Sequence, residues 1–228
     1  MKRSKKTFLL LFILIFPSAF YVYLTAGKER SFVLLPYYGP KHPIVVNSKK
    51  DTVYYDVPDF KFASQSGNQL TYSSLLGRIW VCCFEHLNDT KLAPSQAVLM
   101  NRIESRTDLD STLRLLTFAL DSESTKSLAT YAQMVHAGKR QFFLSSGTEK
   151  MSDFATNAFY RPVDSSTKDG FIHFFLVDRE GHIRGIYNGL HVKDIDELID
   201  NISMLEAAYY VKQNREDGKK GDDDGGAM

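Results

Sequence analysis

The stretch from Arg78 to Met100, RIWVCCFEHLNDTKLAPSQAVLM, decides the fold of this 228-residue chain. Its apolar run from Ile79 to Phe84 predicts a buried strand, and the polar residues that follow predict a loop. Pro94 then opens an amphipathic helix, as proline in a first helical turn can, and we expect this helix to end at about Arg106. The loop between this strand and this helix is the first candidate for a functional site.

Strands and helices alternate through the rest of the chain. A near-continuous apolar run at 113–120 is typical of a strand covered on both faces. The other expected elements are a hairpin over 51–77 with its turn at 65–68, helices at 124–136, 148–159 and 192–211, a strand at 140–144, and a hairpin over 171–187 with its turn at 178–181. This order predicts an α/β fold: a mixed sheet flanked by helices, with an added N-terminal β-hairpin.

The first 27 residues predict a membrane anchor. The cationic start MKRSKK precedes an apolar stretch from Thr7 to about Gly27, which is long enough to span a bilayer. A competing interpretation is a signal peptide whose apolar core ends at Pro17 to Ala19. Both place the folded domain on the extracytoplasmic side, and the retained anchor predicts a single-pass protein of the inner membrane with its domain in the periplasm.

The remaining boundaries follow from composition. Residues 28–50 contain prolines and aromatics and predict an extended connector, and residues 51–212 are long enough for one domain with a real core. The tail, 213–228, has no apolar side chain before its last two residues and is expected to be disordered. The formal net charge of +1, without a basic stripe, argues against nucleic-acid binding.

Cys82 and Cys83 are the only cysteines, and they are adjacent on the predicted strand. Neighbouring strand residues point to opposite faces, so a disulfide between them would need a distorted backbone. We interpret both as structural thiols, because free cysteine is commonly buried.

Four spaced signatures carry a family resemblance. They are LPYYGP at 35–40, VPDFKFASQSGNQLTYSSLLGRIWVCCF at 57–84, LLTFALDSEST at 115–125, and FFLVDREGHIRGIYNG at 174–189. In this order they resemble the SCO/SenC family, particularly its membrane-anchored bacterial members, over about residues 35–205. The resemblance implies a thioredoxin-like fold. It also implies copper delivery, thiol reduction and electron transport in the assembly of cytochrome c oxidase.

The resemblance also shows which functional residues this chain lacks. The family loop carries CxxxCP, and alignment on Pro94 places Asp89 and Ala93 at its two cysteine positions, while the family histidine falls on Gly170. Two thiolates and an imidazole bind Cu(I), and the thiols can cycle through a disulfide. With these three positions vacant, the sequence predicts no catalytic residue, no cofactor and no enzymatic activity.

Three hypotheses about function follow. The first is a membrane-tethered, degenerate SCO-like domain that binds an envelope protein of respiratory oxidase assembly or copper handling. The second is a thiol oxidoreductase that uses Cys82 or Cys83. The third is a divergent metal carrier that uses His86 and His173, although strand alternation turns His173 to the opposite face from position 170.

Overall fold

The computed structural model describes residues 16, 35–46, 49–107, 109, 112–146, 148–160 and 173–224. Apart from Phe16, the predicted anchor and the first part of the connector lie outside these residues, as does Gly170. No helix in the described part of the chain has both the length and the apolar character to cross a bilayer. One compact unit begins at Leu35 and contains every strand described here.

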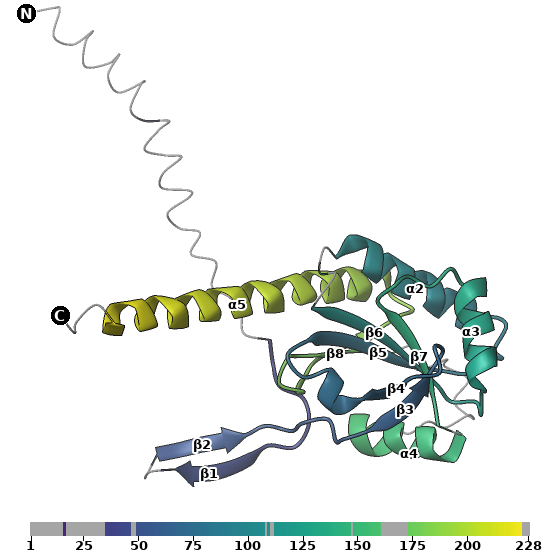
Figure 1. Ribbon diagram of the computed structural model, residues 1–228, viewed down its shortest axis with the longest axis horizontal. Helices are drawn as coiled ribbons and strands as arrows, with labels where there is room; N and C mark the ends of the chain where they lie inside the picture. The colour runs from purple at the N-terminus through teal and green to yellow at the C-terminus, as the bar shows by residue number, and fades with distance from the viewer. Residues whose placement is uncertain are drawn as a thin grey trace, which may run out of the picture. The chain divides into compact units, whose positions relative to one another are not determined.

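A seven-stranded mixed sheet forms the centre of this unit (Figure 1). Its strands, in spatial order, are β4 (Gln69–Thr71), β3 (Lys61–Ser64), β7 (Gln141–Ser145), β6 (Leu113–Ala119), β5 (Ile79–Glu85), β8 (His173–Val177) and β9 (Ile183–Asn188). The three central strands β5, β6 and β7 are parallel, and the remaining pairs are antiparallel. The predicted mixed sheet is confirmed. A separate antiparallel pair, β1 (His42–Val46) and β2 (Lys49–Val53), begins within the segment predicted as a connector.

Helices cover both faces of the large sheet. They are α2 (Leu92–Arg106), α3 (Thr125–Met134), α4 (Thr148–Phe159) and α5 (Val192–Asp224), with a short 3-10 helix at Tyr72–Ser74. Figure 1 shows α2, α3 and α5 on one face and α4 on the other. The helices α2 and α3 connect parallel strands, as crossover connections require. Ser124 caps α3, because its side chain accepts a hydrogen bond from the Ser127 amide at 3.1 Å.

The alternation of β5 divides the core into two layers. Ile79, Val81 and Cys83 pack with α2 and α5 residues, and Trp80 and Cys82 pack with α4 residues. Every residue of β5 except Phe84 is buried. The apolar run in the sequence therefore reflects a strand with helices on both sides.

Two predicted boundaries differ from the structure. The turn at 65–68 joins β3 and β4 as an antiparallel pair, but these strands are shorter than the predicted 51–77 hairpin. The last helix does not end at Val211: α5 continues to Asp224, through most of the segment predicted as disordered. Extending an existing helix adds a hydrogen bond per residue without a new nucleation step. A prediction based on apolar content alone leaves out the free energy of these hydrogen bonds.

A buried ion pair fixes the turn between β8 and β9. Asp178 is fully buried; its Oδ2 accepts from Arg184 Nη1 at 2.9 Å, and its Oδ1 accepts from the amides of Glu180 and His182. The Arg184 guanidinium also donates to the Leu35 and Pro36 carbonyl groups and lies 4.0 Å from the centre of the Tyr37 ring. This pair therefore holds both the turn and the first described segment of the unit.

We expect Asp178→Ala to lower the free energy of unfolding by about 3–5 kcal/mol, because it leaves the Arg184 charge buried without its partner. The control is Asp196→Ala, which removes an exposed ion pair to Arg102 and should cost less than about 1 kcal/mol. Urea denaturation of the full chain measures both changes, and similar losses for the two variants would contradict this role.

Candidate functional site

The candidate site lies where the parallel strands β5 and β6 end. Ligands of open α/β sheets bind at the carboxyl ends of parallel strands. Side-chain contacts join the two loops that follow these strands: His86 Nδ1 lies 2.8 Å from Asp121 Oδ1, and Asn88 Nδ2 donates to Asp121 Oδ2 at 3.3 Å and to Glu123 Oε1 at 3.2 Å. The two loops therefore form one continuous surface.

Asp89, at the first vacant cysteine position, lies just before helix α2. Its Oδ1 accepts hydrogen bonds from the Leu92 amide at 2.9 Å and the Lys91 amide at 2.8 Å. These bonds, the Leu92 bond first, lower the pKa of the Asp89 carboxyl group. The carboxylate thus satisfies amides that a helix start leaves without partners. The place of Asp89 just before a predicted helix was the signal in the sequence for this role.

Ala93, at the second vacant position, is part of the core. It is 0% exposed and belongs to a buried cluster with Ala119, Leu128, Tyr131 and Phe143. Its amide donates to the Asp89 carbonyl oxygen at 3.1 Å, so the two positions stand one helical turn apart. The methyl group of Ala93 offers neither a donor nor an acceptor to a ligand.

Both thiols are inaccessible. Cys82 and Cys83 are free and 0% exposed, and they lie in the two core layers on opposite faces of the sheet. Burial raises the pKa of each thiol well above its usual value. The hydroxyl group of Thr117, 3.8 Å from Cys83 Sγ, is the hydrogen-bonding group beside that thiol. Neither cysteine has the exposed, electropositive surroundings of a reactive thiolate.

The two candidate histidines have different surroundings. His86 is exposed and contacts Asp121, whereas His173 is half-buried in β8, opposite Asn188 of β9. Among the described residues, no group of three or more His, Cys, Asp and Glu side chains is arranged to hold a metal ion.

Sequence reasoning missed a buried acid at the end of β5. Glu85 is 4% exposed, and its Oε1 accepts a hydrogen bond from the Tyr131 hydroxyl group at 3.4 Å. Burial, helped by the nearby charges of Asp89 and Asp121 and opposed by the Tyr131 bond, raises the pKa of Glu85 to about 8. A charged residue that interrupts the apolar alternation of β5 was the available signal.

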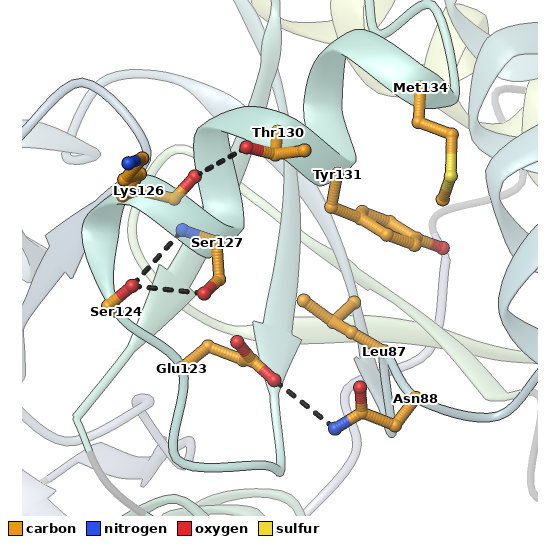
Figure 2. A pocket seen from close by; sticks show the side chains of 9 residues that line it. All are labelled: Leu87, Asn88, Glu123, Ser124, Lys126, Ser127, Thr130, Tyr131 and Met134. Atoms are coloured by element: carbon orange, nitrogen blue, oxygen red, sulfur yellow. Dashed lines mark hydrogen bonds between the residues drawn. The ribbon is translucent and has the colours of Figure 1, made fainter.

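A groove runs beside this acid, between the loop at Leu87 and Asn88 and helix α3 (Figure 2). Its volume is about 450 Å³. The lining residues are Leu87, Asn88, Glu123, Ser124, Lys126, Ser127, Thr130, Tyr131 and Met134. Tyr131 lines the groove and bonds to Glu85, so the buried carboxyl group lies directly behind the groove wall.

Comparisons with known proteins agree with this architecture. No family model matches the chain. The SCO1 protein homolog of Bacillus subtilis (strain 168) is 25% identical over 162 residues, which are 67% of this chain and 84% of that protein. A SCO1/SenC family lipoprotein from Bacillus anthracis str. Ames has a TM-score of 0.60 at 19% identity, covering 67% of this chain and 95% of the other. Bradyrhizobium japonicum ScoI with copper bound has a TM-score of 0.53 at 16% identity, covering 66% and 99%.

The central parallel strands, the helices on both faces and the loop before α2 define a thioredoxin-like α/β protein. Within that class, the ordered sequence signatures and the match to the Bacillus subtilis protein support membership of the SCO/SenC family. The predicted family and the thioredoxin-like mixed sheet are thus confirmed.

The burial of both cysteines predicts slow alkylation. In native protein, Cys82 and Cys83 should react with a thiol reagent such as dithionitrobenzoate roughly a hundredfold more slowly than in the unfolded chain. Both should react fully in concentrated guanidinium chloride, which controls for prior oxidation. A fast native phase equivalent to one thiol would contradict the structural interpretation.

Because the pKa of Glu85 is raised, we expect the protein to become less stable as pH rises. The folded state keeps the Glu85 proton up to about pH 8, whereas the unfolded state releases it above pH 4.5. The contribution of Glu85 to the free energy of unfolding is therefore fully present below pH 4.5 and is lost as pH rises to about 8. Glu85→Gln removes this titration. Between pH 5 and 9, wild type should lose on the order of 4 kcal/mol relative to Glu85→Gln in urea denaturation. Parallel pH profiles for the two proteins would show that Glu85 titrates normally.

Proposed function

We propose that this chain is a SCO-like protein that acts by binding another protein, without copper ligation or thiol chemistry of its own. The fate of the two described family positions carries the proposal: Asp89 caps a helix and Ala93 is core. Copper(I) sites depend on soft sulfur ligands, and neither residue supplies one. The chain is accordingly not an enzyme.

The site retains features that suit a binding surface. Polar contacts tie the loops after β5 and β6 together, and a groove opens beside them. Loops held by a rigid sheet are common recognition surfaces. The loops and the groove thus form an exposed surface with a defined shape, which can bind a partner without thiol or copper chemistry.

The descriptions of relatives support a proposal about the process in which the partner acts. A solved structure from the same family is described as BsSco, a member of the Sco family of cytochrome c oxidase assembly proteins. We place the partner of this chain in the same process, respiratory oxidase assembly or copper handling in the cell envelope. The Bacillus anthracis relative is described as a lipoprotein. For this chain we propose a single-pass anchor in residues 1–27 and a domain on the extracytoplasmic side of the inner membrane.

The alternatives receive less support. A thiol oxidoreductase would need an accessible, low-pKa thiol, and burial raises the pKa of both thiols. A metal carrier using His86 and His173 would need further ligands, and His86 is already engaged by Asp121. Two imidazoles also lack the soft sulfur that favours Cu(I).

A Cu(I) competition titration tests the vacant site. Purified full chain is mixed with Cu(I) and a chromophoric chelator, and Bradyrhizobium japonicum ScoI, which binds copper in its solved structure, is the positive control. We expect the chelator to keep all the metal when this chain is present. Retention of one equivalent of Cu(I) by the chain would overturn the proposal.

Complementation tests the protein-binding role. Cells lacking this chain should lose assembled oxidase, and both wild type and Cys82→Ala/Cys83→Ala should restore it, because no thiol takes part. Immunoblotting and thermal melting confirm that the variant accumulates and folds. A well-folded variant that fails to restore oxidase would favour thiol chemistry, and unaffected oxidase in the deletion strain would refute the assigned partner process.

A further inference from the structure

The groove beside α3 combines apolar and acidic walls. Figure 2 shows Leu87, Tyr131 and Met134 grouped at one part of the groove, with Glu123 and Asn88 joined by a hydrogen bond at its rim. Met134 is 64% exposed, which is high for a large apolar side chain. Flexible, polarisable methionine side chains adapt well to the apolar parts of a bound segment.

Four carboxyl groups lie at this groove or near it. Glu123 lines the groove, Asp121 bonds to Asn88 of the groove wall, Glu85 lies behind Tyr131, and Asp89 accepts hydrogen bonds from amides at the start of α2. Within the described part of the chain, the one ion pair of these four groups is the contact between His86 and Asp121. Lys126 lines the groove without pairing with any of them.

The electrostatic effect of these carboxyl groups is visible at Glu85. Asp89 and Asp121 both raise the pKa of Glu85, in the same direction as burial, so the potential at its carboxyl group is negative. Among the described residues, the only hydrogen bond to the Glu85 carboxyl group is the 3.4 Å bond from Tyr131. A cation placed in the groove would be attracted to the carboxylates of Asp89, Asp121 and Glu123, and to Glu85 once that group is ionised.

We propose that this groove receives an arginine or lysine side chain from an extended segment of the partner protein. The proposal rests on the protein-binding function above and names the chemistry of the partner at the same site. The aliphatic stem of a basic side chain would lie against Leu87 and Met134, while its charged end would pair with the carboxylate of Glu123.

An anionic ligand fits this groove less well. The first turn of α3 borders the groove, but the Ser124 hydroxyl group already accepts the Ser127 amide. Glu123 precedes that turn and would repel an anion. Charge complementarity therefore favours a basic partner segment over a phosphate or an acidic peptide.

Binding of a basic side chain is coupled to the proton on Glu85. The groups that face Glu85 are Tyr131 from α3, Cys83 from the same strand, and Asp89 and Asp121 from the two loops. A neutral Glu85 attracts a cation weakly, and an ionised Glu85 attracts it strongly. The affinity should therefore increase as pH rises from 7.5 to 9, the range in which Glu85 ionises.

Fluorescence anisotropy with labelled peptides tests this groove. The probe is acetyl-Leu-Arg-Leu-amide carrying a fluorophore, and the matched control replaces arginine with neutral, isosteric citrulline. We expect full-length protein in mild detergent to bind the arginine peptide roughly fivefold or more tightly than the citrulline peptide. Equal affinity for both peptides, or no binding of the arginine peptide, would overturn the proposal.

Variants locate the binding and test the proton coupling. Glu123→Gln should weaken the arginine peptide roughly threefold, whereas Asp153→Asn on α4, on the other face of the sheet, should leave it unchanged. Glu85→Gln should abolish the increase in affinity between pH 7.5 and 9. Equal effects of Glu123→Gln and Asp153→Asn, or an unchanged pH profile in Glu85→Gln, would contradict this assignment. If the arginine peptide does not bind but the Cys82→Ala/Cys83→Ala variant still restores oxidase, the proposal for the groove is wrong and the proposed protein-binding function stands.

Discussion

Burial of β5 on both faces is the constraint on which the rest of the structure depends. The strand pairs with β6 on one side and β8 on the other, and its side chains alternate between two apolar layers. This arrangement fixes the loop after Glu85, and the start of α2 that follows it, at the carboxyl ends of the parallel strands. It also buries the two thiols in separate layers, away from solvent and from each other.

Much of this architecture could be predicted from patterns along the chain. The apolar run of β5, the run at 113–120 and the helix beginning near Pro94 correspond to β5, β6 and α2. Such patterns succeed because strand and helix periodicity is a local property. The C-terminal boundary was wrong because α5 extends a helix that is already formed, and composition does not measure that cooperativity.

The site was harder to predict, because its main contacts join residues that are distant in sequence. Glu85 and Tyr131 are 46 positions apart, and His86 and Asp121 are 35 apart. Their meeting depends on how α3 returns across the sheet, which periodicity does not specify. Alignment to the family signature places Asp89 and Ala93, which carry no sulfur, at the cysteine positions. The contacts of these two residues, to helix-start amides and within the core, became clear only from geometry.

The burial of Ala93 has a consequence for any attempt to build a metal ligand at this position. A cysteine there would place its sulfur among Ala119, Leu128 and Phe143, away from water. Burial of that kind favours the neutral thiol over the thiolate that metals require. Sulfur at position 93 would therefore be a poor ligand unless the neighbouring side chains were repacked as well.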